Sequence, residues 1–226
     1  IMEGYPVTVR LFDPPLHEFL PNLEELVADV TRARVLGKPD SAKEALLNRV
    51  KALMEANPMM GHRGVRLGIT FPDIYKAQVR AILRAALNLK KRGKEVKVQI
   101  MIPQVAEAKE LEYIVNNVVK PTAEEVFKEF GDRIDFKIGT MMETVRACLT
   151  ADKIAKVVDF MSFGTNDLTQ AVFSFSRDDV ENKFMSKYLE LGILPYDPFI
   201  TIDADGVAKL MKIAIDLARS TKPEIE

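Results

Sequence analysis

The chain has 226 residues, of which 47% are hydrophobic, and its 32 basic and 33 acidic side chains leave a formal net charge of −1. This length and apolar content suffice for one sizeable hydrophobic core. The balanced charge argues against nucleic-acid or membrane-surface partners, because proteins of both classes usually carry a basic excess. No stretch approaches the roughly 20 apolar residues that a membrane-spanning helix needs.

The sequence contains a single cysteine, Cys148. Disulfides are therefore not expected, and we predict a reducing compartment, the cytoplasm. Cys148 follows Ala147 within a predicted helix, which favours a buried core thiol. The first residues, Ile1-Met2-Glu3, lack the basic segment and apolar core of a secretory signal. We expect the chain to be a piece of a longer protein.

The first half of the chain predicts, in order, a strand at 6–12 that ends at Asp13-Pro14-Pro15, helices at 22–35 and from Ser41, and a long helix from Pro72 to Gly93. Ser41 and Glu44 have the spacing of a capping box. The segment GHRGVRLG at 61–68 contains three glycines, which favours a shaped loop.

The second half predicts three strands separated by helices. The strands lie at 96–103, 136–143 and 159–166, and the helices begin near Ala106, at a capping box of Thr122 and Glu125, at Val145, and near Gly206 after a polar loop. Near-continuous apolar strands that alternate with helices are typical of a parallel sheet covered on both faces. We therefore predict an α/β fold with four parallel strands.

Reactive groups in such folds collect at the carboxyl ends of the strands. Glu143 ends the third predicted strand and Asp167 the fourth, and adjacent strands lie only about 4.8 Å apart. Two carboxylates at one point suit a hard cation such as Mg²⁺. The alternative is a pair of solvated carboxylates, or caps for the following helices. His17 and His62 are isolated in the sequence, so a zinc site is not expected.

The other two strand ends carry an arginine and a polar pair. Arg10 lies in an apolar strand, where a guanidinium needs either an anionic ligand or an ion pair, for example with Asp13. The second strand ends in Pro103-Gln104, where the chemistry is less obvious.

Three further arginines are candidate anion-binding residues. Arg63 and Arg66 stand among glycines, either over a pocket or on a solvated loop. Arg177 either binds phosphate or forms an ion pair with Asp178 or Asp179.

Four segments, taken together, resemble the phosphoenolpyruvate/pyruvate-binding domain of the pyruvate, phosphate dikinase family over essentially the whole chain. They are VRLFDPPLHEFLP at 9–21, NPMMGHRGVRLG at 57–68, IGTMMET at 138–144 and SFGTNDLTQAVFSFSRDD at 162–179. IGTMMET and GTNDLTQ would also fit phosphoenolpyruvate synthase or enzyme I of the sugar phosphotransferase system. LFDPPLHEFLP favours the dikinase.

The resemblance implies a partial TIM-type (β/α)8 barrel of about four βα units, with residues 1–226 forming part of the family's C-terminal phosphoenolpyruvate/pyruvate-binding domain. It implies an enzyme that interconverts ATP, phosphate and pyruvate with AMP, diphosphate and phosphoenolpyruvate, and that uses Mg²⁺. It also implies a homodimer and a separate phosphohistidine domain as partner. The residue roles that it implies are phosphoryl and carboxylate binding by Arg10 and Arg63, Mg²⁺ binding by Glu143 and Asp167, substrate orientation by Asn166, lining of the site by Thr165 and Met141, and a further phosphate contact by Arg177.

Some parts of the family pattern do not occur in this sequence. The motif of the phosphorylated histidine and the ATP-grasp domain are missing, and neither His17 nor His62 has that context. Cys148 follows IGTMMET and does not match the family's proton-donating cysteine. We therefore expect no catalytic residue in these 226 residues and no turnover by them alone. A phosphoenolpyruvate synthase-like fragment and a non-catalytic phosphoenolpyruvate/pyruvate-binding module are the alternatives.

Overall fold

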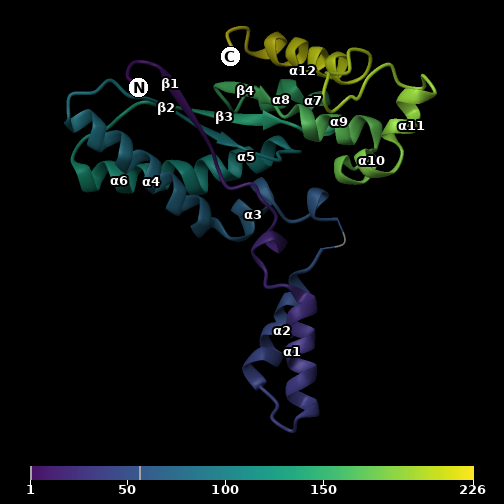
Figure 1. Ribbon diagram of the computed structural model, residues 1–226. Helices are drawn as coiled ribbons and strands as arrows, with labels where there is room; N and C mark the ends of the chain where they lie inside the picture. The colour runs from purple at the N-terminus through teal and green to yellow at the C-terminus, as the bar shows by residue number, and fades with distance from the viewer. Residues whose placement is uncertain (1, 56) are drawn as a thin grey trace. The chain divides into compact units, whose positions relative to one another are not determined.

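The computed structural model describes residues 2–55 and 57–226, apart from the side chains of Leu16, His17 and Pro58. Any role of the His17 side chain therefore lies outside the described residues. The chain forms two compact units (Figure 1): the first consists of Ile1–Asp13 together with Gly64–Glu226, and the second of Pro14–Arg63.

The first unit is built on one sheet whose four described strands are all parallel. They are β1 (Pro6–Arg10), β2 (Lys97–Ile102), β3 (Phe136–Met142) and β4 (Phe160–Phe163), in the spatial order β1-β2-β3-β4. Each strand therefore neighbours the one that precedes it in the chain. This arrangement confirms the predicted α/β fold with a partial barrel of parallel strands.

Helices connect the strands and follow the last one. They are α3 (Gly64–Thr70), α4 (Pro72–Lys91), α5 (Ala108–Ile114), the π-helical segment η3 (Val115–Val119), α6 (Lys120–Phe130), α7 (Val145–Leu149), α8 (Ala151–Ile154), α9 (Thr165–Phe173), α10 (Arg177–Lys183), α11 (Met185–Glu190) and α12 (Val207–Thr221). In Figure 1, α4 and α6 lie side by side below the sheet, and α12 packs on α7 and α8.

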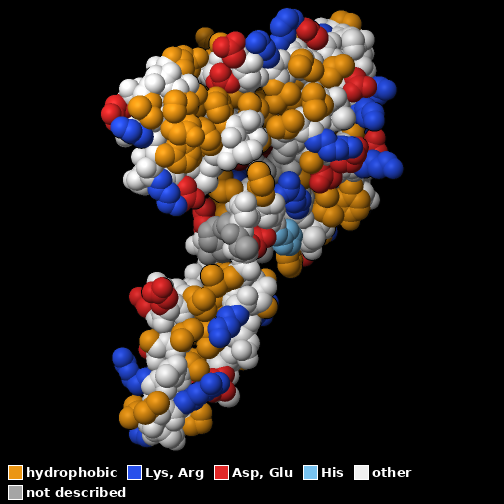
Figure 2. Space-filling view, turned by 90° about the vertical axis from the view of Figure 1, so that its right-hand side faces the viewer, with side chains coloured by type: hydrophobic (Ala, Val, Ile, Leu, Met, Phe, Trp, Pro, Cys, Tyr) orange, Lys and Arg blue, Asp and Glu red, His pale blue; other side chains and the backbone are white. Residues whose placement is uncertain are grey.

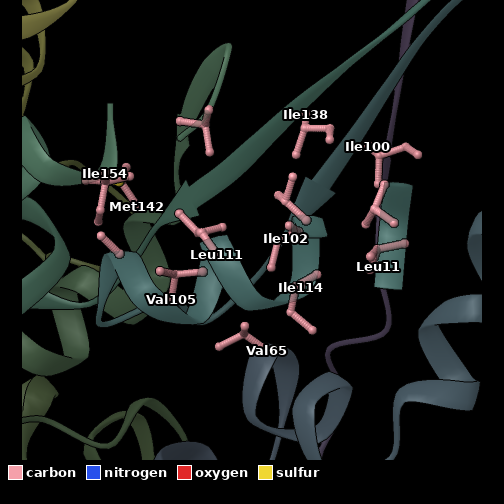
Figure 3. Close-up of a cluster of buried hydrophobic side chains, with 14 of the residues drawn as sticks. Leu11, Val65, Ile100, Ile102, Val105, Leu111, Ile114, Ile138, Met142 and Ile154 are labelled. Atoms are coloured by element: carbon pink, nitrogen blue, oxygen red, sulfur yellow. The ribbon is translucent and has the colours of Figure 1, made fainter. Parts of the chain in front are cut away.

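The hydrophobic core lies between the sheet and these helices. Successive side chains of a strand point to opposite faces, and alternate residues of β2 and β3, among them Ile100, Ile102 and Ile138, point into the core (Figure 3). Leu111 and Ile114 of α5 meet them there and are fully buried. Burying one such side chain contributes roughly 1.5–3 kcal/mol, so this layer holds the strand ends in place.

The opposite face of the sheet is covered only in part, so the prediction of a sheet covered on both faces is wrong. Lys97 and Lys137 are exposed there and Gln99 is half-buried. Toward the carboxyl ends the face is more closed, and Phe160 of β4 is 6% exposed. Its ring lies over Gly139, where an added Cβ atom would come within 2.4 Å of ring carbons.

The surface of the first unit mixes charges of both signs. On the view in Figure 2, acidic and basic side chains lie interspersed among hydrophobic ones. Two ion pairs, Arg80 with Glu125 and Arg84 with Glu129, link α4 to α6 at 3.0 and 2.7 Å. Exposed pairs of this kind contribute at most about 1 kcal/mol each. No helix in the described residues is long and apolar enough to cross a bilayer.

The second unit is a small helical segment with its own core. Its elements are η1 (Leu16–Phe19), α1 (Leu23–Val35), α2 (Ser41–Leu53) and η2 (Pro58–Met60). Its buried side chains are Leu26 and Val30 of α1 with Leu47 and Val50 of α2. The predicted helices at 22–35 and from Ser41 are confirmed.

Both predicted capping boxes are wrong. The N-cap of α2 is Asp40, whose side chain accepts from the N–H groups of Ala42 and Lys43, while Glu44 pairs with Arg34 at 2.6 Å. Thr122 lies inside a continuous helical run, where no N-terminus needs a cap. The capping box in the structure joins Glu107 and Glu110 at the start of α5.

Two predicted non-helical segments are helical. Residues 64–68 of the glycine-rich segment belong to α3, and the polar residues after β4 form the first turn of α9. The strand predicted at 159–166 accordingly ends at Phe163. Fully buried Val65 and Leu67 anchor α3, so packing overrides the low helix propensity of its glycines.

Cys148 is fully buried, which confirms the prediction of a core thiol. Burial raises the pKa of this thiol to about 11. Because the thiolate is the reactive form, we expect Cys148 at pH 8 to react at least about a hundredfold more slowly in the folded chain than in the unfolded chain. The raised pKa also means that the thiol's contribution to stability is complete below about pH 8.5 and is lost as the pH rises toward 11. Thiol titration with and without denaturant measures the ratio, and immediate reaction in native buffer would contradict it.

Candidate functional site

The candidate site lies at the carboxyl ends of the strands in the first unit. Glu143 directly follows β3, and Gly164 follows β4 and caps α9. Thr165, Asn166 and Asp167 then form the first turn of that helix, with Thr165 and Asn166 exposed and Asp167 half-buried. The first four N–H groups of a helix lack intrahelical partners, so this turn presents backbone donors beside the Asp167 carboxylate.

Glu143 is only 2% exposed, which is rare for an ionisable residue. Its Oε1 accepts a hydrogen bond of 2.6 Å from the backbone N–H of Gln104. It does not cap the following helix, because the N-cap of α7 is Thr144, whose Oγ1 accepts from the N–H of Ala147. The capping alternative for Glu143 is therefore wrong.

Gly164 makes room for Glu143. A Cβ atom at position 164 would lie 2.6 Å from Oε2 and 2.7 Å from Cβ of Glu143, and 3.2 Å from Cγ of Met141. These distances are far below van der Waals contact. The glycine in GTNDLTQ thus leaves the space that the side chain of Glu143 occupies.

Gln104 connects the two candidate ligands, a role that was not predicted from the sequence. Its backbone N–H donates to Glu143, and its side-chain Nε2 donates to Oδ1 of Asp167 at 3.2 Å. The structure thereby brings Glu143 and Asp167 to the same end of the sheet. The signal in the sequence was a polar residue directly after an apolar strand, the same signal that selected the two carboxylates.

Arg10 is not buried, contrary to the expectation for an arginine in an apolar strand. Its side chain is 44% exposed, because β1 is one of the two edge strands of the sheet in the described residues. Nη1 lies 3.4 Å from Oδ2 of Asp13, so the predicted ion pair is confirmed. The same nitrogen lies 3.6 Å from Sδ of Met141 on β3. The guanidinium therefore reaches from β1 across β2 toward β3, the strand that Glu143 follows.

Tyr75 of α4 forms a hydrogen bond with the segment that follows β1. It is fully buried and its hydroxyl donates to the carbonyl oxygen of Phe12 at 3.1 Å. Burial, together with the nearby charges of Asp13 and Glu143, raises the pKa of Tyr75 above its ordinary value. The phenol therefore stays neutral and acts as a hydrogen-bond donor.

Arg177 forms a different ion pair from the predicted ones. Its Nε lies 3.3 Å from Oε1 of Glu181 on the same helix, α10, and not beside Asp178 or Asp179. Its guanidinium also lies 5.8 Å from the ring centre of Phe199. Neither contact involves Glu143 or Asp167. A phosphate contact by Arg177 therefore stays a prediction.

Arg63 is the last residue of the second unit and is 6% exposed. Within that unit its Nη1 donates to the carbonyl oxygen of Met59 at 3.4 Å. Its role in substrate binding stays a prediction. Arg66, the other arginine of the glycine-rich segment, lies on α3 and not on a loop.

The donor set fits Mg²⁺ better than a transition metal. Glu143 and Asp167 supply two carboxylate groups, and no group of three or more His, Cys, Asp or Glu side chains that could hold a metal ion occurs in the described residues, at this site or any other. Mg²⁺ is usually bound through one or two carboxylates, with water and substrate as its remaining ligands. Two carboxylates tied together by one glutamine match that pattern.

A hollow of about 760 Å³ lies at the opposite end of the sheet. Lysines line it, but Lys90, Lys94 and Lys97 each pair with a carboxylate, at 2.6, 2.9 and 3.1 Å. The hollow therefore lacks the unbalanced positive charge of an anion site, and we place the candidate site at the carboxyl ends.

Comparison with known proteins agrees with this architecture. Residues 1–221 match the family described as "PEP-utilising enzyme, PEP-binding domain". The chain belongs to this family. Its members are named for binding phosphoenolpyruvate, abbreviated PEP.

Curated relatives carry a more specific name. The chain is 54% identical to pyruvate, phosphate dikinase of Entamoeba histolytica over 226 residues, 99% of this chain and 26% of that protein. It is 47% identical to the enzyme of that name from Giardia intestinalis over 225 residues, 100% of this chain and 25% of that protein. It is 45% identical to the chloroplastic one of Mesembryanthemum crystallinum over 227 residues, 100% of this chain and 23% of that protein. The chain thus spans about a quarter of the length of these relatives.

Proposed function

We propose that residues 1–226 are part of the C-terminal PEP/pyruvate-binding domain of a pyruvate, phosphate dikinase and bind PEP or pyruvate together with Mg²⁺. The observation that carries this proposal is the pair of carboxylates, Glu143 and Asp167, joined through Gln104 at the strand ends. The names of the relatives favour the dikinase over a phosphoenolpyruvate synthase-like enzyme.

In this proposal Glu143 and Asp167 hold the cation. When bound, Mg²⁺ stabilises the negative charge on the enolate oxygen of pyruvate as a Lewis acid. Arg10, half-exposed at the end of β1, donates its planar fork of N–H groups to the phosphoryl oxygens, and Arg63 does the same. These fixed positive charges neutralise the phosphoryl group during its transfer.

The first turn of α9 orients the substrate. Asn166 is exposed there and offers an amide that can both donate and accept hydrogen bonds, and Thr165 lines the site beside it. Arg177 supplies a further phosphate contact when it exchanges its partner Glu181 for the ligand. In this proposal these side chains bind and orient the substrate, so the chain contributes binding and electrostatic stabilisation.

The rest of the reaction belongs to other parts of the enzyme. A phosphohistidine domain, charged from ATP and phosphate, delivers the phosphoryl group to this site, and the whole enzyme is a homodimer in the cytoplasm. The phosphohistidine domain and the homodimer rest on the sequence resemblance, and the cytoplasm rests on the single cysteine of the sequence.

Calorimetric titration of the 226-residue chain with PEP tests the proposal. We expect binding that requires Mg²⁺ and is abolished by a chelator. Asp167→Asn should weaken it at least about tenfold, or roughly 1.4 kcal/mol. The matched control is Asp216→Asn, which removes the same charge from an exposed position on α12 that pairs with Lys212. Binding that is equally strong without Mg²⁺ and in Asp167→Asn would contradict the proposed site.

A further inference from the structure

Gln104 lies between the two candidate metal ligands and contacts both. We propose that it is a positioning residue that holds the carboxylates of Glu143 and Asp167 in the orientation required for a divalent cation. This inference rests on the proposed function and adds to it a residue of the outer coordination sphere.

The contacts come from two different parts of the residue. The backbone N–H donates to Oε1 of Glu143 at 2.6 Å, and the side-chain Nε2 donates to Oδ1 of Asp167 at 3.2 Å. The ligands are 39 and 63 residues away along the chain. A carboxylate can only accept hydrogen bonds, so the amide nitrogen is the group that can bind Asp167. One residue therefore fixes one oxygen of each ligand.

The backbone at Gln104 is unusual. Its φ of 59° lies in the left-handed region, which residues other than glycine rarely adopt. Glycine would adopt this conformation without steric cost. The backbone geometry alone therefore does not account for a glutamine here, and strained conformations of this kind concentrate at functional sites.

Neighbouring residues hold the glutamine side chain in place. Gly64 faces it so closely that a Cβ atom there would lie 2.5 Å from Cβ and 2.9 Å from Cγ of Gln104. The N–H of Val65 donates to the carbonyl oxygen of Pro103 at 3.1 Å, which joins the start of α3 to the same turn. Gln104 is 4% exposed as a result, and its amide cannot swing into solvent.

The chemical role follows from what a metal site needs. Residues that hydrogen-bond to ligating carboxylates fix their orientation, and their loss typically lowers metal affinity about 10- to 100-fold. An amide donor suits this task because it is neutral and adds no charge that would repel the cation. A leucine at 104 would keep the backbone bond to Glu143 and remove only the bond to Asp167, so the two contacts are separable.

A titration with Mn²⁺ as a paramagnetic substitute for Mg²⁺ tests the inference, with free Mn²⁺ measured by its electron paramagnetic resonance. The variants of the 226-residue chain are Gln104→Leu, Gln104→Gly and Asp167→Asn. Gln99→Leu is the control, because Gln99 lies on β2, the strand that precedes Gln104, and its Oε1 accepts from Thr8 and not from a candidate metal ligand. We expect Gln104→Leu and Gln104→Gly to bind Mn²⁺ about tenfold more weakly, and Gln99→Leu to bind as the unchanged chain does.

Thermal unfolding of the same variants separates positioning from folding. Gln104→Gly relieves the backbone strain, so it should unfold at a temperature at least as high as the unchanged chain and still lose affinity. If Gln104 had only a structural role, the affinity for Mn²⁺ would change in parallel with the stability of the fold. Gln104→Gly would then bind Mn²⁺ normally. If both Gln104 variants bind Mn²⁺ normally while Asp167→Asn does not, the inference is overturned and the proposed function stands. If Asp167→Asn also binds normally, both are overturned.

Discussion

Gly164→Ala is expected to lower the affinity of the chain for Mn²⁺ or Mg²⁺ about a hundredfold, or near 2.7 kcal/mol. The new methyl group would lie 2.6 Å from Oε2 and 2.7 Å from Cβ of Glu143. Rotation of the carboxylate alone cannot relieve a contact with Cβ, so the whole side chain or β3 must shift. Mg²⁺ requires ligand distances of about 2.1 Å in near-ideal geometry, and a displaced ligand is therefore lost.

Gly192→Ala is the matched control for this substitution. Gly192 has a φ of 66° and open space around its Cβ position, so alanine there strains the backbone but touches nothing. We expect a stability loss of about 1 kcal/mol with unchanged affinity for Mn²⁺. Titration of both variants with Mn²⁺ measures the change in affinity, and thermal unfolding measures the change in stability. Normal metal binding by Gly164→Ala would mean that Glu143 is not a ligand.

The isolated 226-residue chain is expected to self-associate through β1. This strand is an edge of the sheet, and four of its five residues are exposed, including Val7 at 39%. An uncovered apolar edge presents unpaired N–H and C=O groups to another chain. The other edge is better covered, because the N–H of Met161 on β4 donates to the carbonyl oxygen of Glu226 at 2.8 Å. Sedimentation should therefore show concentration-dependent species larger than 25.4 kDa.

Val7→Lys tests whether β1 is the surface involved. Lysine is a common protective residue on edge strands, and we expect it to weaken self-association about tenfold, near 1.4 kcal/mol. Val27→Lys places the same change at a valine of α1 with 36% exposure and should leave association unchanged. A chain that sediments as a monomer at all concentrations would contradict this prediction, and equal effects of the two variants would assign association to another surface.

The strand cores and the polar residues at their ends were predictable from sequence. The runs around Ile100, Ile138 and Phe160 are apolar and bounded by turn or helix signals, and the parallel order follows from the helices between them. Glu143 and Asp167 could be selected because a carboxylate after an apolar strand has few structural reasons to be there. Strand spacing suggests that the two carboxylates lie close together. Their shared contact with Gln104 depends on the tertiary structure and could not be predicted from that spacing.

The missed features depend on interactions between distant residues. The position of Gln104 after an apolar strand is visible in the sequence, but its contacts are with residues 39 and 63 positions away and appear only in the folded chain. The same reasoning explains Thr122. Its sequence resembles a helix start, but the π-helical segment before it keeps the helix continuous and buries its side chain at 1% exposure.

The exposure of Arg10 was missed for a related reason. A strand sequence does not say whether the strand lies at the edge of its sheet. PVTVRLF is apolar enough for an interior strand, yet β1 has a neighbour on one side only among the described residues. At an edge position the guanidinium of Arg10 stays partly solvated and pairs with Asp13. The desolvation cost of a buried guanidinium therefore does not arise.

An anomalous-difference map at the manganese absorption edge, from crystals of the chain soaked in Mn²⁺, shows directly whether Glu143 and Asp167 hold a divalent cation. We predict one strong peak at the carboxyl ends of β3 and β4, about 2.1 Å from a carboxylate oxygen of Glu143 and from one of Asp167. A map with its strong peaks only at other carboxylates, and none between these two, would contradict the account.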